Sequence, residues 1–266
     1  FARSPANLAM AAINLDNMSG GRFFLGLGAS GKLVIEDLHG ETFSKPLVRI
    51  REYIKIIRMA LDGERLEYEG EFFSTKRFRL RIQPLEKNMP IYIASLSPPS
   101  LRLTGEIADG WFPIFLAPER MSPLLDQIQA GASKSGKSLE DITVSPQVSI
   151  YVTDNVQEAR NKERPHIAWY IGGMGEFYHE YMHRIGFGED ADKVKEAFDN
   201  RDRVKAAELV TDEMVDATTI IGNPSQCREK MDMFFGLGVN EIRRVFNENS
   251  KSNQGESMRS LAKFIN

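Results

Sequence analysis

The chain has 266 residues, of which 42% are hydrophobic and 27% are charged, a composition typical of a globular protein and not of a disordered or collagen-like chain. The formal net charge is −3 without long runs of one sign, so nucleic acid is not an expected partner. No apolar stretch approaches the roughly 20 residues of a membrane-spanning helix. The single cysteine, Cys227, excludes an intrachain disulfide, and these features together predict a protein of the reducing cytoplasm with no membrane partner.

A helix is predicted almost at the start of the chain. Ser4 can cap this helix, Pro5 takes its first position, and the pair Gly20 and Gly21 ends it. Its apolar face needs a partner, because an isolated terminal helix cannot cover it. Since the first residue is Phe1 and not methionine, we expect the sequence to be part of a longer chain.

Beyond this helix, short apolar runs alternate with amphipathic stretches. Strands are predicted at residues 23–27, 90–95, 110–115, 142–153 and 241–246. Helices are predicted at residues 45–61, 98–107, 119–134, 224–235 and 251–266, and a long, mainly helical stretch at 156–213 is broken at 172–173 and 186–188. Residues 67–82 alternate apolar and charged side chains, which predicts a small hairpin outside the main sheet.

Fully apolar strands separated by helices indicate a parallel α/β sheet that is covered on both faces. Five main strands are too few for a complete eight-stranded barrel. The pattern therefore fits either an open doubly wound sheet or a barrel whose first three strands lie before Phe1. Periodicity alone does not distinguish these two folds.

The first chemical motif is Gly-Leu-Gly-Ala-Ser-Gly at residues 26–31, which directly follows a strand and matches the pattern of dinucleotide-binding turns. That fingerprint also needs a helix at its third glycine and a second strand within roughly 30 residues. Here the next long helix is predicted only near Lys45, and no second strand precedes Glu67. The favoured interpretation is a glycine-rich loop that lets a ligand approach the carboxyl end of a strand.

The second motif is His-Glu-Tyr-Met-His at residues 179–183. On a helix, His179 and His183 would share a face and could bind zinc, while Glu180 would activate the bound water. A third ligand is required, and neither remaining histidine has a protease-like spacing, which leaves only Glu189 or Asp190 as candidates. The favoured interpretation is a helix surface beside the core, with no metal.

The third motif lies where the strand at 90–95 turns into the helix at 98–107. Ser97 is placed to cap the helix, Pro98 takes its first position, and Ser95 and Ser100 add hydroxyl groups. Free backbone N–H groups and these hydroxyls would suit a phosphate, although a capped helix with no ligand explains the same residues. Beside the 26–31 loop, at the same end of a parallel sheet, the two loops together favour a phosphate-bearing cofactor.

Several short motifs share an order and spacing with a known family. They include MSGGRFFLGLG at residues 18–28, TGEIADGW at 104–111 and YIGGMGEFY at 170–178, with shorter matches at 3–16, 40–53, 68–73, 221–224 and 236–239. This set resembles the bacterial-luciferase-like family of flavin-dependent oxidoreductases over nearly the whole chain. The resemblance implies a (β/α)8 TIM barrel that here lacks about its first three β/α units. Residues 1–266 would form a single barrel domain from strand four to strand eight, with a hairpin insertion at about 67–82 and a helical insertion at about 156–213.

The resemblance also implies a cofactor. The family binds FMN or its deazaflavin analogue, coenzyme F420, at the carboxyl mouth of the barrel, through the loop after strand four and the turn after strand five. Carried over to this chain, the cofactor-binding residues are Gly26, Gly28, Ala29, Ser30, Ala94, Ser95, Ser97 and Ser100. The luciferases place an arginine where this chain has Ala29, and many members place glycine where it has Ser97. The missing arginine, together with the segment at 108–111 that is common in deazaflavin-dependent reductases, favours coenzyme F420 over FMN.

By the same resemblance, the expected activity is that of a luciferase-like monooxygenase or a methylenetetrahydromethanopterin reductase-like enzyme, which transfers hydride or activates oxygen on a small organic substrate. A homodimer is consistent with the family. No residue is a convincing catalytic acid or base, because the groups nearest the ring would come from strands before Phe1. The alternatives are a non-catalytic, truncated flavin-binding paralogue and, less favoured, a zinc hydrolase built on His179, Glu180 and His183.

Overall fold

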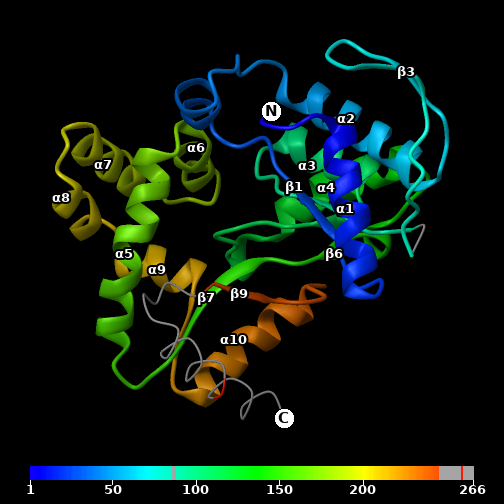
Figure 1. The fold of residues 1–266 in the computed structure, drawn as a ribbon. Coiled ribbons are helices and arrows are strands. Elements are labelled where there is room, and N and C mark those ends of the chain that lie inside the picture. The colour runs from blue at the N-terminus through cyan, green and yellow to red at the C-terminus, as the bar shows by residue number, and fades with distance from the viewer. Residues whose placement is uncertain (86–87, 246–258, 260–266) are drawn as a thin grey trace. The chain divides into compact units, whose positions relative to one another are not determined.

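The computed structural model describes residues 1–85, 88–245 and 259. The chain divides into two compact units (Figure 1). Unit 1 comprises Phe1–Phe112 and Leu125–Thr143, and unit 2 comprises Pro113–Leu124 and Val144–Asn266. Each unit contains parallel strands with helices around them. The expectation of a single domain over 1–266 stays a prediction.

The main sheet of unit 1 contains parallel strand pairs. Its strands are arranged in the order β1-β4-β5-β6, with bounds β1 (Leu25–Leu27), β4 (Ile91–Ile93), β5 (Gly110–Trp111) and β6 (Thr143–Val144). In register, Gly26 lies beside Tyr92, and Ile93 lies beside Trp111. The strands predicted at 23–27, 90–95 and 110–115 are therefore confirmed, although each is shorter than predicted.

Helices cover one face of this sheet, and α1 packs against α2 (Figure 1). The helical segments are α1 (Pro5–Ser19), η1 (Val34–Leu38), α2 (Pro46–Leu61), α3 (Pro98–Ile107), α4 (Ser122–Lys134) and η3 (Leu139–Asp141). The predicted cap of α1 is present, since the Ser4 hydroxyl accepts a hydrogen bond from the Asn7 amide at 3.3 Å. Gly20 ends the helix in the left-handed conformation, with φ 70°. The π-helix η1 was not predicted.

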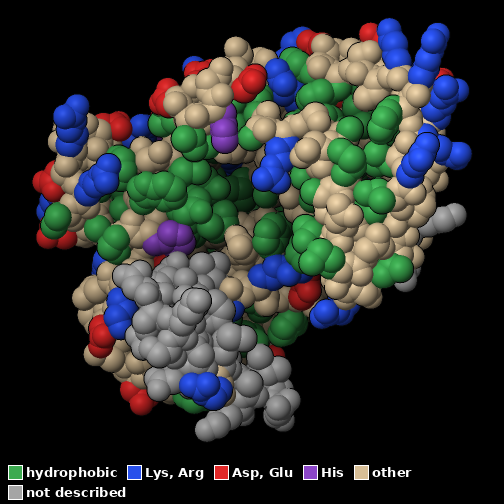
Figure 2. Space-filling view, viewed as in Figure 1, with side chains coloured by type: hydrophobic (Ala, Val, Ile, Leu, Met, Phe, Trp, Pro, Cys, Tyr) green, Lys and Arg blue, Asp and Glu red, His purple; other side chains and the backbone are tan. Residues whose placement is uncertain are grey.

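The predicted hairpin is present as β2 (Leu66–Glu69) paired antiparallel with β3 (Ser74–Phe78). A buried carboxylate of α2 holds its turn: Glu52, 5% exposed, accepts hydrogen bonds from the backbone N–H groups of residues 71, 72 and 73 at 2.7, 3.0 and 3.0 Å. Lysine and arginine side chains project around this hairpin (Figure 2). The hairpin therefore presents both basic and acidic side chains, such as the pair Lys76 and Glu69 at 3.5 Å, and is held to the core through the buried carboxylate of Glu52.

Unit 2 contains a second parallel sheet with β7 (Gln147–Val152) at its centre, between β8 (Ile220–Gly222) and β9 (Arg243–Val245). Its helical segments are η2 (Pro118–Arg120), α5 (Val156–Gly173), α6 (Glu176–Arg184), α7 (Gly188–Asp199), α8 (Arg203–Glu208), α9 (Asp212–Thr218) and α10 (Pro224–Gly236). The breaks predicted at 172–173 and 186–188 are confirmed, because α5 ends at Gly173 and α7 begins at Gly188.

Two strand predictions need correction. The single strand predicted at 142–153 is interrupted between β6 and β7, where Pro146 has no N–H to donate to a neighbouring strand. The strand β8 was not predicted, because its apolar run is short and directly follows a helix. Apart from Arg259, which is helical, the helix predicted at 251–266 lies outside the described residues, as does the end of the last predicted strand, Phe246. No helix in the described part of the chain is long and apolar enough to cross a membrane.

Candidate functional site

The two loops expected to bind a cofactor meet at one edge of the unit 1 sheet. Because β1 and β4 are parallel neighbours, their carboxyl ends lie side by side. The Ala94 amide donates a hydrogen bond to the Leu27 carbonyl oxygen at 2.8 Å. A Cβ atom built on Gly28 would lie 3.5 Å from the Cβ of Ala94. The structure therefore brings the glycine-rich loop and the serine turn together, as the parallel arrangement predicted.

Side chains alternate between the two faces of these strands. Leu25, Ile91 and Ile93 belong to the core that α1 and α2 cover. The opposite face carries Phe24 and Tyr92, whose ring centroids are 4.8 Å apart, and Phe112, whose ring lies 6.4 Å from that of Phe24. This second face therefore carries a cluster of aromatic rings.

On this second face, the carboxyl ends of β1 and β4 carry no side chain larger than a methyl group. Gly26, Gly28 and Ala94 are exposed. Neither glycine is required by the fold, since neither has a positive φ and a Cβ would lie 3.9 Å from Phe112 at Gly26 and 3.5 Å from Ala94 at Gly28. By contrast, a Cβ at Gly105 would lie 2.0 Å from a backbone oxygen. The glycines at this edge thus leave room against the main chain, which is what a closely bound flat ligand needs.

The rest of the glycine-rich loop is shaped by its backbone. Ala29 is half-buried and packs against the core of unit 1. Ser30 is exposed and has φ 63°, a left-handed conformation that is uncommon for serine and is concentrated at ligand-binding turns. A short helical turn follows Gly31 and leads into η1, with the Ile35 amide bonded to the Gly31 carbonyl oxygen at 3.1 Å.

The serine turn uses its hydroxyl groups internally. Ser95 is 5% exposed, and its Oγ lies 2.7 Å from the hydroxyl of Thr104. Ser97 and Ser100 bond to each other, with 2.9 Å between their Oγ atoms and 3.1 Å from the Ser97 amide to Ser100 Oγ. The first two residues of α3 are prolines and have no N–H to offer. The start of the helix therefore offers an anion fewer hydrogen-bond donors than the sequence predicted. Its serines instead fix the shape of the turn.

Unit 2 contains a buried carboxylate that sequence reasoning missed. Glu163 on α5 has no exposed surface and is contacted by Ser149 Oγ at 2.9 Å, by the Tyr151 hydroxyl at 2.8 Å and by His166 Nδ1 at 2.8 Å. Burial acts to raise the pKa of Glu163, but the bonds from His166, Tyr151 and Ser149 together lower it. A histidine ring oriented by a buried carboxylate can hold or transfer a proton at its other nitrogen. The signal available in the sequence was the Glu-x-x-His spacing on one helix face.

Aromatic rings surround this histidine. The centroids of Tyr170 and Phe115 lie 5.0 and 5.6 Å from that of His166, and Tyr178 lies 4.6 Å from Tyr170. Apolar side chains gather over α5 and α6 in Figure 2, and among the exposed ones is Trp169, at 43%. Burial raises the pKa of Tyr178 to about 12, so this hydroxyl stays protonated at neutral pH.

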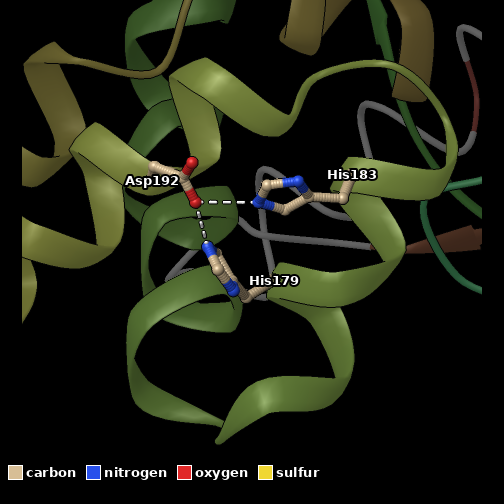
Figure 3. A group of neighbouring side chains, drawn as sticks. All are labelled: His179, His183 and Asp192. Atoms are coloured by element: carbon tan, nitrogen blue, oxygen red, sulfur yellow. Dashed lines mark hydrogen bonds and ion pairs between the residues drawn. The ribbon is translucent and has the colours of Figure 1, made fainter.

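The His-Glu-x-x-His motif lies on α6, with both histidines on one face (Figure 3). Their Nε2 atoms each lie 2.7 Å from the same oxygen of Asp192, on α7. The bonds from His183 and then His179 lower the pKa of Asp192. Glu180 instead pairs with Arg184 at 3.5 Å. The acidic residue beside the histidines is therefore Asp192, and not Glu189 or Asp190 as considered from the sequence.

A parallel α/β fold with an open, small-residue edge at the carboxyl ends of its strands defines a class of enzyme scaffolds that bind ligands at that edge. Residues 1–241 match the family model described as luciferase-like monooxygenase. The chain belongs to this family, and the family assignment made from sequence motifs is confirmed.

Two similar proteins have named activities. A Mycobacterium tuberculosis protein named as a coenzyme F420-dependent oxidoreductase is 34% identical over 256 residues, which is 90% of this chain and 74% of that protein. The 5,10-methylenetetrahydromethanopterin reductase of Archaeoglobus fulgidus is also 34% identical, over 244 residues, 90% of this chain and 72% of that protein.

Solved structures agree on the fold. The coenzyme F420-dependent tetrahydromethanopterin reductase from Methanopyrus kandleri superposes with a TM-score of 0.82 at 24% identity, covering 95% of this chain and 77% of that one. The FMN-bound oxygenating constituent of 3,6-diketocamphane monooxygenase from Pseudomonas putida gives a TM-score of 0.61 at 20% identity, covering 91% and 69%. These structures confirm the predicted (β/α)8 TIM-barrel fold class.

Proposed function

We propose that this chain is a coenzyme F420-dependent oxidoreductase that transfers hydride between the coenzyme and a small organic substrate. Two relatives at 34% identity support this proposal, since one is named for coenzyme F420 and the other for reduction of methylenetetrahydromethanopterin. The neutral residue Ala29, where luciferases place an arginine, also favours the deazaflavin over FMN. An FMN-dependent monooxygenase is the second candidate, because a solved structure with FMN shares the fold.

The observation that carries this proposal is the open edge formed by Gly26, Gly28 and Ala94. All are exposed, and the fold does not require either glycine. A flat ring system can approach the backbone here in van der Waals contact, which a larger side chain would prevent. We assign cofactor binding to these residues together with Ala29, Ser30, Ser95, Ser97 and Ser100.

These residues have different roles in the proposed site. Gly26, Gly28 and Ala94 supply the contact surface. Ser30, through its left-handed backbone, turns the loop, and the bonded serines hold the second turn in one conformation. When bound, the coenzyme supplies the carbon that accepts or donates the hydride. The chain itself orients the cofactor and keeps water from the face that lies against the strand ends.

The test is titration of the full chain with coenzyme F420 and with FMN, followed by fluorescence. We expect coenzyme F420 to bind with micromolar affinity or better and more tightly than FMN. Gly28→Val should weaken that binding at least about tenfold by filling the edge, with an unchanged melting temperature. The matched control is Gly236→Val, because Gly236 is exposed and has no atom within 4 Å of a built Cβ.

Three outcomes would count against parts of the proposal. Binding of neither cofactor would exclude the function. Tighter binding of FMN would favour the monooxygenase instead. Wild-type binding by Gly28→Val would show that the cofactor lies elsewhere.

We also propose a reducing, cytoplasmic location and a homodimer. The location is supported by the single cysteine, Cys227, which is buried and forms no disulfide bond. The dimer is supported by the resemblance, because members of the family often form dimers. Analytical ultracentrifugation of the purified chain tests it, and a monomer at micromolar concentration would contradict it.

A further inference from the structure

We propose that His179, His183 and Asp192 form a binding site for a single Zn²⁺ ion that joins α6 to α7. The site is independent of the proposed cofactor edge. The earlier expectation of no metal rested on the absence of a third ligand, and the structure supplies that ligand from the neighbouring helix (Figure 3).

The ligand atoms already converge. His179 and His183 are one helical turn apart, with ring centroids 4.9 Å from each other. Both Nε2 atoms point at Oδ1 of Asp192, each at 2.7 Å (Figure 3). One potential ligand atom from each residue lies within 4.8 Å of the others. Two ligands of a tetrahedral Zn²⁺ ion lie about 3.3–3.5 Å apart, since Zn–N and Zn–O bonds are each about 2.0–2.2 Å. Each 2.7 Å contact to Asp192 would therefore lengthen by less than about 1 Å to admit the ion.

The surroundings of the two rings leave them free to serve as metal ligands. A metal-bound imidazole usually donates its other N–H to a carboxylate, which fixes the ring and its tautomer. Glu176 lies near enough to become such a group after a small side-chain movement, with its Oε2 3.6 Å from Nδ1 of His179. The ring of His183 packs over Gly188, where a built Cβ would lie 2.4 Å from Nδ1. The absence of a side chain at position 188 therefore leaves the space that His183 occupies.

The site is open enough to load. The side chain of His179 is 16% exposed, while those of His183 and Asp192 are 45% and 55% exposed. An ion can therefore enter from solvent and complete its coordination with water. Two imidazole nitrogens and one carboxylate oxygen favour Zn²⁺ and similar transition metals over Mg²⁺ or Ca²⁺, which prefer oxygen ligands.

The ion would act as a structural link. The chain between α6 and α7 is short, running from Ile185 to Phe187, and the ion would fix the angle between the two helices. Glu180, the general base of zinc hydrolases with this motif, is paired with Arg184. The geometry therefore points to metal binding without hydrolysis.

The experiment titrates Zn²⁺ into the full chain, prepared without a histidine tag and stripped with EDTA, in competition with a chromophoric chelator. We expect one Zn²⁺ per chain, micromolar affinity or tighter, and a higher melting temperature with zinc than without it. Asp192→Asn and His183→Asn should each weaken binding at least about tenfold. Asp190→Asn is the matched control, because Asp190 is on the same helix and pairs with Lys193 at 3.2 Å.

A second measurement needs no variant. The chain has four histidines, and ¹⁵N NMR of the wild-type rings should show zinc-induced shifts for His179 and His183, with His39 and His166 unchanged. Three results would overturn the proposal: no stoichiometric binding below millimolar zinc, shifts confined to His39 or His166, or equal weakening of binding by Asp190→Asn and Asp192→Asn.

Discussion

Replacing Glu52 with glutamine should loosen the β2–β3 hairpin from α2. The carboxylate is 5% exposed and accepts hydrogen bonds from three successive backbone N–H groups, at 2.7, 3.0 and 3.0 Å. Glutamine has nearly the same shape, but it is neutral and has only one acceptor oxygen. At least one N–H of the turn would then face the NH2 group of the amide, which cannot accept its proton.

The expected cost follows from the strength of these bonds. A hydrogen bond to a charged acceptor contributes about 1.5–3 kcal/mol, and a neutral one about 0.5–1.5 kcal/mol. Losing one bond and weakening two others should therefore lower the free energy of unfolding by about 2–3 kcal/mol, since water reaches part of the turn and offsets some of the loss. For a domain of this size, each kcal/mol corresponds to about 2–4 °C in melting temperature.

Urea denaturation followed by circular dichroism measures this change, with calorimetry as the second readout. The matched control is Glu71→Gln, which removes an equal charge from the same turn. Glu71 pairs with Lys45 at the surface, where both side chains are about half exposed, so its loss should cost less than about 1 kcal/mol. If Glu52→Gln were no more destabilising than Glu71→Gln, the buried carboxylate would not hold the hairpin.

Three further predictions concern other parts of the molecule. The folded state lowers the pKa of Glu163, so this group stabilises the fold above its ordinary pKa of 4.5 and loses that contribution as the pH falls below it. Glu163→Gln should show a shallower acid dependence in urea melts. Burial raises the pKa of the Cys227 thiol to about 11, so Ellman's reagent should label it only on unfolding. Gly105→Ala should cost about 1–3 kcal/mol by calorimetry, because its Cβ would lie 2.0 Å from the Ile128 carbonyl oxygen.

The parts of the fold that could be predicted are those with a strong local pattern. Apolar residues at 50, 54 and 57 mark the buried face of α2, and all three are buried in the structure. The interruption between β6 and β7 contains Pro146, which a sequence reading can recognise as a strand breaker. The apolar residues on both sides of it nevertheless predicted one continuous strand. The strand β8 contributes only Ile220–Gly222, and its pairing with β7 is a tertiary contact that no local pattern reveals.

The candidate sites also differ in how far the sequence alone could predict them. The loop at 26–31 and the serine turn could be placed together from the parallel arrangement alone. The position of Asp192 beside His179 and His183 depends on how α7 packs against α6, and sequence distance gives no indication of it. For Glu163, the spacing to His166 is local, but its burial and its bonds to Ser149 and Tyr151 come from the packing of α5 on β7.

The open edge at Gly26, Gly28 and Ala94 has a consequence for protein engineering. A cofactor preference set by a charged side chain can be changed by exchanging that residue. At the proposed cofactor edge the surface is main chain and a single methyl group, so every substitution at the two glycines, and every substitution of Ala94 except by glycine, adds bulk. Attempts to switch the cofactor of this chain should therefore leave the strand ends intact and vary the residues around them.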